Sequence, residues 1–328
     1  MKNTIKKVAF LTSGGDAPGM NAVIRAIVRS CVYNNITPIA IHKGYEGLIQ
    51  GNFEEMNARS VKGIINKGGT VIKTSRSSEF RTKAGRKKAY NNLLDNSIDA
   101  LVVIGGDGTF NGAHIFNNEY KIPVIGIPAT IDNDIFGTSH TVGFDSALNT
   151  VVQAIDKIRD TASSHNRLFF IEVMGKDAGH IALNTGVAAG AEEILIPEEN
   201  LGLRRLIKSL KRSKNTGKSS SIVVVAEGDK IGKNVFELKD YVEKHLPDYE
   251  ARVSVLGHIQ RGGSPTCFDR VLASRMGVKA IDSLLKNKAQ VMTGIKNNKM
   301  CLTPLIEAVK GKSKIDSELL RISDIMSI

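Results

Sequence analysis

The stretch Val8-Ala-Phe-Leu-Thr-Ser-Gly-Gly-Asp-Ala-Pro-Gly-Met-Asn21 places a short apolar run directly before a glycine-rich turn. An apolar run that ends in turn residues is typical of a strand buried on both faces. Gly14 and Gly15 let the backbone approach a ligand closely. Asp16 can cap the following helix, and Pro18 suits its first turn. The stretch predicts a helix N-terminus that can bind phosphate, and a tight turn that binds nothing fits it equally well.

The same pattern recurs along the chain. Further apolar runs end in glycine or polar residues at 100–104, 124–127, 168–173, 222–226 and 253–256. Helical patterns separate them, for example at 21–34, 83–96, 146–163 and 266–285. Alternating strands and helices predict an α/β fold with a doubly wound, mostly parallel sheet. Ligands of such sheets bind at the carboxyl ends of the strands, where the polar residues of this chain concentrate.

Composition narrows the class of protein. The 328 residues correspond to about two domains, and 45 basic against 33 acidic residues give a formal charge of +12. The three cysteines form no CxxC pair, which suggests a reducing compartment and no zinc cluster. No apolar run approaches the ~18 residues of a membrane span, and the N-terminus is interpreted as a strand start and not as a signal peptide. We expect a soluble, cytoplasmic protein.

The positive charge is densest in the stretch 204–218, which holds seven basic residues and no acidic one. Leu203, Leu206, Ile207 and Leu210 recur there at helical spacing, so we favour an amphipathic helix with a solvated basic face. Nucleic-acid binding is the less favoured reading, because no aromatic residue lies among the basic ones to stack on bases. Small phosphorylated molecules are the better anionic partners.

Gly105-Gly-Asp-Gly-Thr109 repeats the strand–turn–helix pattern with a carboxylate in its centre. An acidic side chain among backbone N–H donors would repel a phosphate. It makes sense if Asp107 holds Mg²⁺ on the phosphate, because Mg²⁺ binds one or two carboxylates plus phosphate oxygens. The alternative is that Asp107 only caps the helix.

Thr130-Ile-Asp-Asn-Asp134 follows the third strand. If this segment is extended, Asp132 and Asp134 face the same side, so that one can act as a base and the other can order ligands or metal. An Asx-rich turn is the alternative. Later turns supply cationic and histidine side chains that we interpret as a clamp for a phosphorylated substrate: Arg167, Lys176, Arg252, His258 and Arg261.

In this order, the turns resemble those of the bacterial ATP-dependent 6-phosphofructokinase family, from Lys7 to about Leu285. The motifs that carry the likeness are Leu11-Thr-Ser-Gly-Gly-Asp-Ala-Pro-Gly-Met-Asn-Ala22, Val103-Ile-Gly-Gly-Asp-Gly108, Thr130-Ile-Asp-Asn-Asp134, Ser163-Ser-His-Asn-Arg167, Glu172-Val-Met-Gly175 and Val255-Leu-Gly-His-Ile-Gln-Arg-Gly-Gly-Ser-Pro265. The resemblance implies transfer of the ATP γ-phosphoryl group to the 1-hydroxyl of fructose 6-phosphate in glycolysis. It also implies two doubly wound α/β domains of the phosphofructokinase type, each discontinuous: 1–143 with 257–308 for nucleotide, and 144–256 with 309–328 for sugar phosphate.

The resemblance also assigns roles to individual residues. The ATP-binding positions are Gly15, Arg76, Gly106, Asp107, Gly108 and Thr109, with Asp107 on Mg²⁺. Asp132 matches the general base. The sugar-phosphate positions are Thr130, Ile131, Asp132, Met174, Gly175, Lys176, Glu227, His258, Ile259, Gln260 and Arg261. Arg167 and Arg252 match arginines that reach the 6-phosphate from a neighbouring subunit, which implies a homotetramer.

The chain departs from the family pattern at two positions near the reacting groups. Lys176 stands where the family commonly has arginine, and Ala129 stands where ATP-using members often have glycine. A pyrophosphate-dependent phosphofructokinase is the nearest rival, but its members typically carry Asp and Lys at the positions of Gly108 and Ala129. A basic nucleic-acid-binding protein explains the charge of +12, but not the carboxylates of Asp107 and Asp132.

An allosteric site is implied as well, with ADP or phosphoenolpyruvate as effector. The matching positions are Arg25, Arg29, Arg59, Arg159, Gly190, Glu192 and Lys218. A family arginine aligns with Ala58, so Arg59 lies one position away, and a family lysine aligns with Thr216. If the segment around Arg59 is helical, a shift of one residue turns the side chain by ~100°. We therefore expect a weak response to both effectors.

Overall fold

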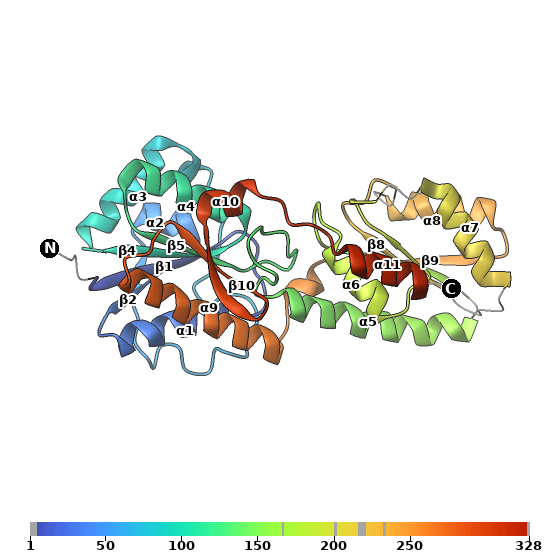
Figure 1. Cartoon of the computed structure of the whole chain (residues 1–328), viewed down its shortest axis with the longest axis horizontal. Helices are drawn as coiled ribbons and strands as arrows, with labels where there is room; N and C mark the ends of the chain where they lie inside the picture. Colours follow the sequence, from blue (N-terminus) through green and yellow to red (C-terminus); the bar gives the residue numbers. More distant parts are fainter. Residues whose placement is uncertain (1–4, 166, 200–201, 216–220, 232–233, 327–328) are drawn as a thin grey trace. The chain divides into compact units, whose positions relative to one another are not determined.

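The computed structural model describes residues 5–165, 167–199, 202–215, 221–231 and 234–326. The chain divides into two compact units (Figure 1). Unit 1 comprises Met1–Ile131, Ile135–Ser146 and Arg261–Ser313, and unit 2 comprises Asp132–Asp134, Ala147–Gln260 and Lys314–Ile328. No helix in the described part of the chain is both long enough and apolar enough to span a membrane.

Unit 1 contains a seven-stranded sheet in the order β11-β10-β5-β4-β1-β2-β3. Its strands are β1 (Lys7–Ser13), β2 (Thr37–Ile41), β3 (Phe53–Glu55), β4 (Ala100–Gly105), β5 (Val124–Pro128), β10 (Val291–Lys296) and β11 (Lys299–Pro304). The five inner strands pair in parallel, whereas β3 and β11 add antiparallel edges. The strand order reverses between β1 and β4, which is where ligands bind in such sheets.

Helices cover both faces of this sheet (Figure 1). One face is covered by α1 (Met20–Tyr33) and α9 (Cys267–Leu285), and the other by α2 (Gly44–Gln50), α3 (Lys83–Asp95), α4 (Asp107–Tyr120) and α10 (Leu305–Lys310). Alternate residues of a strand point to opposite faces. Leu11 and Val103 therefore enter the core beneath α2, α3 and α4, together with Phe110. The predicted strands and helices of this unit are confirmed.

Unit 2 contains a four-stranded, fully parallel sheet in the order β7-β8-β6-β9. Its strands are β6 (Arg167–Val173), β7 (Glu193–Leu195), β8 (Ser221–Ala226) and β9 (Glu250–Val255). Its helices are α5 (Phe144–His165), whose first residues belong to unit 1, α6 (His180–Ala188), α7 (Gly202–Asn215), α8 (Val235–His245) and α11 (Ser317–Met326).

The basic stretch forms the predicted amphipathic helix. In α7, Leu206 and Leu210 are buried in the core of unit 2, and Leu203 and Ile207 pack against it. Arg204, Lys208 and the other basic side chains of its described face are exposed. The apolar stripe therefore places this helix, and its positive charge faces solvent.

Candidate active site

The two Gly-Gly-Asp turns of unit 1 contact each other directly. Thr109 Oγ1, in the first turn of α4, donates to the carbonyl oxygen of Ser13 at the end of β1, at 2.9 Å. Between them lies Gly105, where a Cβ atom would come within 2.3 Å of that same oxygen. Tyr45 Oη of α2 donates to the Thr109 carbonyl at 2.6 Å. The glycine thus allows the close approach that brings both turns to one edge of the sheet.

The first turn also holds Arg261. A Cβ atom on Gly15 would lie 2.5 Å from Arg261 Nη1, and this nitrogen donates to the Asp16 carbonyl at 3.2 Å. The structure thus brings together a predicted nucleotide position and a predicted sugar-phosphate position. The expected cap is wrong, however: α1 begins at Met20 with Gly19 as its N-cap, because Gly19 takes a left-handed φ of 103° and delays the helix past Asp16.

A segment that the sequence did not single out, 70–74, lies along the first turn. Thr12 Oγ1 is 3.0 Å from Thr70 Oγ1 and donates to the Lys73 carbonyl at 3.0 Å. Thr74 Oγ1 donates to the Gly14 carbonyl at 2.9 Å. These bonds fix the chain just before Arg76, whose side chain is exposed. In the sequence, only the hydroxyl residues at the end of the buried strand and in the segment 70–74 could have indicated this contact.

Asp107 is the first residue of α4, and Gly106 is the N-cap. The Asp107 side chain is half-buried. The next residue, Gly108, is exposed, and apart from its chain neighbours and its own helix backbone no atom lies within 4 Å of a Cβ placed there. Within the described residues, no group of three or more His, Cys, Asp or Glu side chains is arranged to hold a metal ion. A single carboxylate beside open space fits Mg²⁺, which takes most of its ligands from water and substrate phosphates.

The segment after β5 is not extended as expected. Residues 131–132 form a bend and Asn133 has a left-handed φ of 52°, so Asp132 and Asp134 do not share one face of an extended segment. Asp132 is nevertheless buried, with 8% of its surface exposed. A Cβ atom on Gly106 would lie 3.9 Å from Thr130 Cβ. Thr130 and Ile131 therefore begin this segment beside the second Gly-Gly-Asp turn.

In unit 2, polar groups gather after the carboxyl ends of β6 and β8. Glu227 Oε1 accepts hydrogen bonds from the backbone nitrogens of Gly175, at 3.3 Å, and Lys176, at 2.7 Å. Met174 N donates to Oε1 of Gln260 at 3.2 Å, and the Gln260 side chain is fully buried. Burial and the nearby Glu227 carboxylate raise the pKa of Glu172. These bonds order the turn after β6.

The next predicted residues lie on the short helix η2 (Gly257–Arg261). His258 and Ile259 are both exposed there, with 57% of Ile259 accessible. Gln260 is turned inward, and its Nε2 donates to the Gly257 carbonyl at 3.0 Å. The helix therefore presents His258 and Ile259 to solvent and uses Gln260 to hold the turn after β6.

Arg167 and Arg252, two further predicted substrate residues, lie on β6 and β9. Arg167 begins β6 and pairs in register with Glu250, the first residue of β9. Arg167 Nε lies 3.0 Å from Glu250 Oε2, and Arg252 also forms an ion pair with Glu250. Arg252 is opposite Phe169 in register, so both arginines lie toward the amino-terminal ends of their strands, whereas Met174 follows the carboxyl end of β6. The predicted clamp for a phosphorylated substrate stays a prediction.

Two of the side chains matched to an effector site already form hydrogen bonds with backbone groups of the chain. Arg159 donates to the carbonyl oxygens of Ala189 and, at 3.2 Å, of Gly190. The Glu192 side chain is 4% exposed and accepts a hydrogen bond from Ile222 N. Arg25 and Arg29 lie on α1, and the predicted Lys218 lies outside the described residues.

Arg59 is placed by turns and not by a helix. Residues 58–63 form turns, and Asn57 Oδ1 accepts a hydrogen bond from Arg59 N at 2.9 Å. The expected rotation of ~100° for a shift along a helix therefore does not apply. The Arg59 side chain is exposed.

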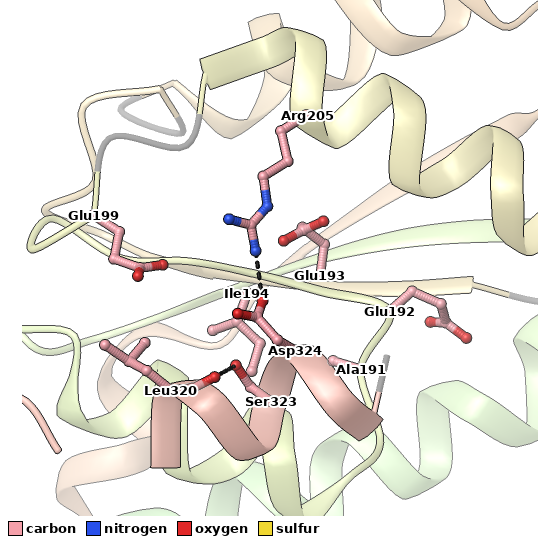
Figure 2. A pocket seen from close by; sticks show the side chains of 9 residues that line it. All are labelled: Ala191, Glu192, Glu193, Ile194, Glu199, Arg205, Leu320, Ser323 and Asp324. Carbon is pink, nitrogen blue, oxygen red and sulfur yellow. Dashed lines mark hydrogen bonds and ion pairs between the residues drawn. The ribbon is translucent and has the colours of Figure 1, made fainter. Parts of the chain in front are cut away.

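A pocket of unit 2 lies beside Glu192, between β7, α7 and α11 (Figure 2). Figure 2 shows Arg205 reaching across it to Asp324, with Nη2 2.5 Å from Oδ1. Burial raises the pKa of Glu193, another residue of the wall. The ion pair fills the centre of this pocket, which holds none of the predicted active-site residues.

Comparisons with known proteins place these turns in a family. A family model described as Phosphofructokinase matches residues 7–284. The chain is 51% identical over 324 residues to "ATP-dependent 6-phosphofructokinase 1" of Thermus thermophilus, covering 99% of this chain and 100% of the relative. It is 47% identical over 325 residues to "ATP-dependent 6-phosphofructokinase 2" of Bacteroides thetaiotaomicron, covering 99% of both.

A solved structure extends the likeness to the fold. Phosphofructokinase from Saccharomyces cerevisiae superimposes with a TM-score of 0.89 at 35% identity, over 98% of this chain. The match spans 48% of the yeast chain, so this chain corresponds to about half of it. The predicted fold of the phosphofructokinase type is confirmed.

Proposed function

Because the chain belongs to the phosphofructokinase family, we propose that it transfers the γ-phosphoryl group of ATP to the 1-hydroxyl of fructose 6-phosphate in glycolysis. The observation that carries this proposal is the edge of the unit 1 sheet, where two Gly-Gly-Asp turns meet at the Thr109–Ser13 hydrogen bond. Phosphoryl transfer depends mainly on positioning and electrostatics, which such an edge supplies.

ATP is the favoured donor over pyrophosphate. Apart from its chain neighbours and its own helix backbone, Gly108 has no protein atom within 4 Å of a Cβ position, and it has no left-handed φ, so packing does not require glycine there. The open space suits a nucleotide phosphate, which a carboxylate would repel. Ala129 is 1% exposed in a bridge to Val142, a place that suits a small side chain and not a lysine.

Asp107 is proposed to hold Mg²⁺ on the phosphates of ATP. When bound, the metal ion neutralises charge on the transferred group. The backbone N–H groups of Asp107 and Gly108, in the first turn of α4, are proposed to bind phosphate oxygens, whereas Thr109 N donates to the Gly106 carbonyl at 3.0 Å. Gly15 and Arg76 complete the nucleotide positions, and unit 1 is thus the proposed nucleotide-binding unit.

Asp132 is proposed as the general base. Its carboxylate accepts the proton of the sugar 1-hydroxyl as that oxygen attacks the γ-phosphorus, and the bond to the β-phosphate oxygen breaks to leave ADP. Thr130 and Ile131 lie beside it and orient the sugar. A base of this kind contributes ~10²–10⁴-fold to the rate.

Unit 2 is proposed to bind the sugar phosphate through Met174, Gly175, Lys176, Glu227, His258, Ile259 and Gln260, with Arg261 of unit 1. Lys176 supplies charge but not the bidentate fork of an arginine. Arg167 and Arg252 lie toward the amino-terminal ends of β6 and β9, away from the turn after β6, which supports the proposal that they serve a neighbouring subunit in a homotetramer.

Regulation by ADP or phosphoenolpyruvate is proposed to be weak. Arg159 and Glu192 must give up bonds to backbone groups before they can bind an effector, and Ala58 replaces a family arginine. Each missing charged contact costs ~1.5–3 kcal/mol, about tenfold or more in affinity. Titration of both effectors at subsaturating fructose 6-phosphate tests this, and a strong shift at sub-millimolar effector contradicts it.

One coupled assay with fructose 6-phosphate tests the reaction. We expect turnover with ATP, less with GTP and little with pyrophosphate; the highest rate with pyrophosphate would overturn the donor assignment. Salt-dependent retention of RNA or DNA on a filter would favour the nucleic-acid alternative. We further propose a cytoplasmic location, and fractionation of cells tests it.

A further inference from the structure

Asp269 is a fully buried carboxylate that the proposed reaction does not use. It lies in the first turn of α9, where the Thr266 side chain caps the helix. Its Oδ1 accepts a hydrogen bond from Gly143 N at 2.9 Å. Its Oδ2 accepts one from Ser146 N at 2.8 Å and one from Ser146 Oγ at 2.6 Å. One side chain thus holds Gly143 and the first turn of α5, within the segment 141–146 that is called the 141–146 turn below.

That turn is bonded in its own right to the end of β5. Val142 N donates to the Pro128 carbonyl at 3.0 Å, and Val142 pairs with Ala129 as an isolated bridge. Thr141 Oγ1 donates to the Thr130 carbonyl at 2.6 Å. Hydrogen bonds at Gly143 and Thr141, joined by the backbone between them, therefore connect Asp269 to Thr130, which lies two residues before Asp132.

The 141–146 turn also packs closely against the first Gly-Gly-Asp turn and the residues that follow it. A Cβ atom on Gly143 would lie 2.6 Å from Ala17 Cβ, and Gly143 has a left-handed φ of 103°. A Cβ atom on Gly19 would lie 2.7 Å from Val142 Cγ1 and 3.7 Å from Asp269 Cβ. Close packing leaves the turn few alternative positions while the Asp269 bonds are intact.

We propose that Asp269 is a positioning residue for phosphoryl transfer: through Gly143 and Ser146 it holds the 141–146 turn, which in turn fixes Thr130 and the Asp132 that follows. This inference rests on the proposed function. Apolar residues would fill the same volume at lower cost, since a buried charge is expensive unless it is fully hydrogen-bonded. The three donors that bond to the Asp269 carboxylate fix the position of the 141–146 turn more accurately than apolar packing would.

The ionised form of Asp269 is the one that accepts all three bonds. Burial raises its pKa to about 6, and the neighbouring carboxylate of Asp145 on α5 acts in the same direction. Asp145 itself accepts a bond from Thr266 Oγ1 at 2.6 Å. Arg270, the next residue of α9, directs its guanidinium to the Pro265 carbonyl and to Ser264 Oγ. At neutral pH the carboxylate is ionised, and it gains a proton below about pH 6.

The test is the steady-state kinetics of Asp269→Asn, with kcat expressed per folded enzyme. The amide keeps the shape but turns an N–H toward a donor. We expect kcat to fall tenfold or more, because small misplacements of reacting groups are costly, while the KM values for ATP and fructose 6-phosphate change less than threefold. The matched control is Asp282→Asn, later in the same helix and half-exposed, with unchanged kcat. A kcat of Asp269→Asn within twofold of this control would overturn the proposal.

Two further variants keep the test decisive if Asp269→Asn folds poorly. Ser146→Ala removes one donor and retains the carboxylate, and Thr141→Val cuts the series of bonds at its far end. Each is expected to lower kcat at least threefold. If they act through one linkage, the double variant is no slower than the slower single variant, whereas multiplied losses would overturn the proposal.

A pH profile separates positioning from mere stability. The acid limb of kcat near pH 6 should be present in the wild type and absent from Asp269→Asn, which cannot ionise; the same limb in both proteins would contradict the proposal. Asp132→Asn belongs in the same experiment. Near-normal kcat of Asp132→Asn would overturn the proposed base. If Asp132→Asn loses turnover but Asp269→Asn keeps the kcat of the wild type, only the positioning role of Asp269 is overturned.

Discussion

Replacement of Gly105 by alanine should destabilise unit 1, whereas the same replacement at Gly108 should not. At Gly105 the new methyl group would lie 2.3 Å from the Ser13 carbonyl oxygen and 2.5 Å from Thr109 Oγ1. Backbone must therefore move, and the buried Thr109–Ser13 hydrogen bond is lost. Overpacking costs ~1–3 kcal/mol and the lost hydrogen bond a net ~1 kcal/mol, so we expect about 2–4 kcal/mol in total.

Gly108 is the matched control, three residues further along. No atom lies within 4 Å of its Cβ position, and it occupies the first turn of α4. Alanine in a helix is favoured over glycine by ~0.5–1 kcal/mol, so Gly108→Ala should be neutral or slightly stabilising. The added methyl should instead raise the KM for ATP, because it enters the space proposed for phosphate.

Thermal unfolding followed by circular dichroism measures both variants. For a unit of roughly 200 residues, each kcal/mol moves the Tm by about 2–4 °C, so Gly105→Ala should lower it by about 5–15 °C. Equal Tm values for the two variants would contradict this expectation, because the two glycines have opposite surroundings in the structure.

Three further outcomes follow. The folded pKa of Asp269, about 6, lies above its unfolded value of 3.8, so this carboxyl contributes stability below pH 4 that is lost as the pH rises through 6. The shift corresponds to about 3 kcal/mol in the free energy of unfolding. Urea unfolding at pH 4.5 and pH 7 should show this decline in the wild type but not in Asp269→Asn. Asp107→Ala should stay folded and lose activity at every practical Mg²⁺ concentration; a lower Tm with activity retained in the cold would indicate a helix cap instead. Co-refolded Arg252→Ala and Asp132→Asn subunits should regain part of the activity, and verified hybrids with none would place both residues in the same site of one subunit.

The sequence was informative where a signal is local. Continuous apolar runs located β1, β4, β5, β6, β8 and β9, because strands covered on both faces need such runs. The hairpin of β10 and β11 was missed, although its two central residues, Asn297 and Asn298, both have the positive φ that a tight hairpin turn requires. Its strands mix polar and apolar residues, so they lack the unbroken apolar run that marks the other strands.

Contacts between distant segments were beyond the sequence. The bonds of Thr12 to the 70–74 segment join residues about sixty positions apart, and no spacing rule signals them. The place of Arg167 and Arg252 in the sheet was not predictable either, because a motif gives the order of residues but not the end of the strand at which they lie. The bend at 131–132 likewise depends on the tertiary bonds of its neighbours.

The division of unit 1 into separate stretches has a consequence for the order in which the chain is made. Its first stretch ends at Ile131, whereas α9, β10 and β11 lie within Arg261–Ser313. At ~5–20 residues per second, the ribosome delivers that last stretch on the order of 10 s after the first. During this interval α1 has no α9 to pack on and β5 has no neighbour on its outer side. The nascent chain therefore completes the continuous run of unit 2 before the nucleotide turns are fully supported, and this interval is when exposed apolar surface would attract a chaperone.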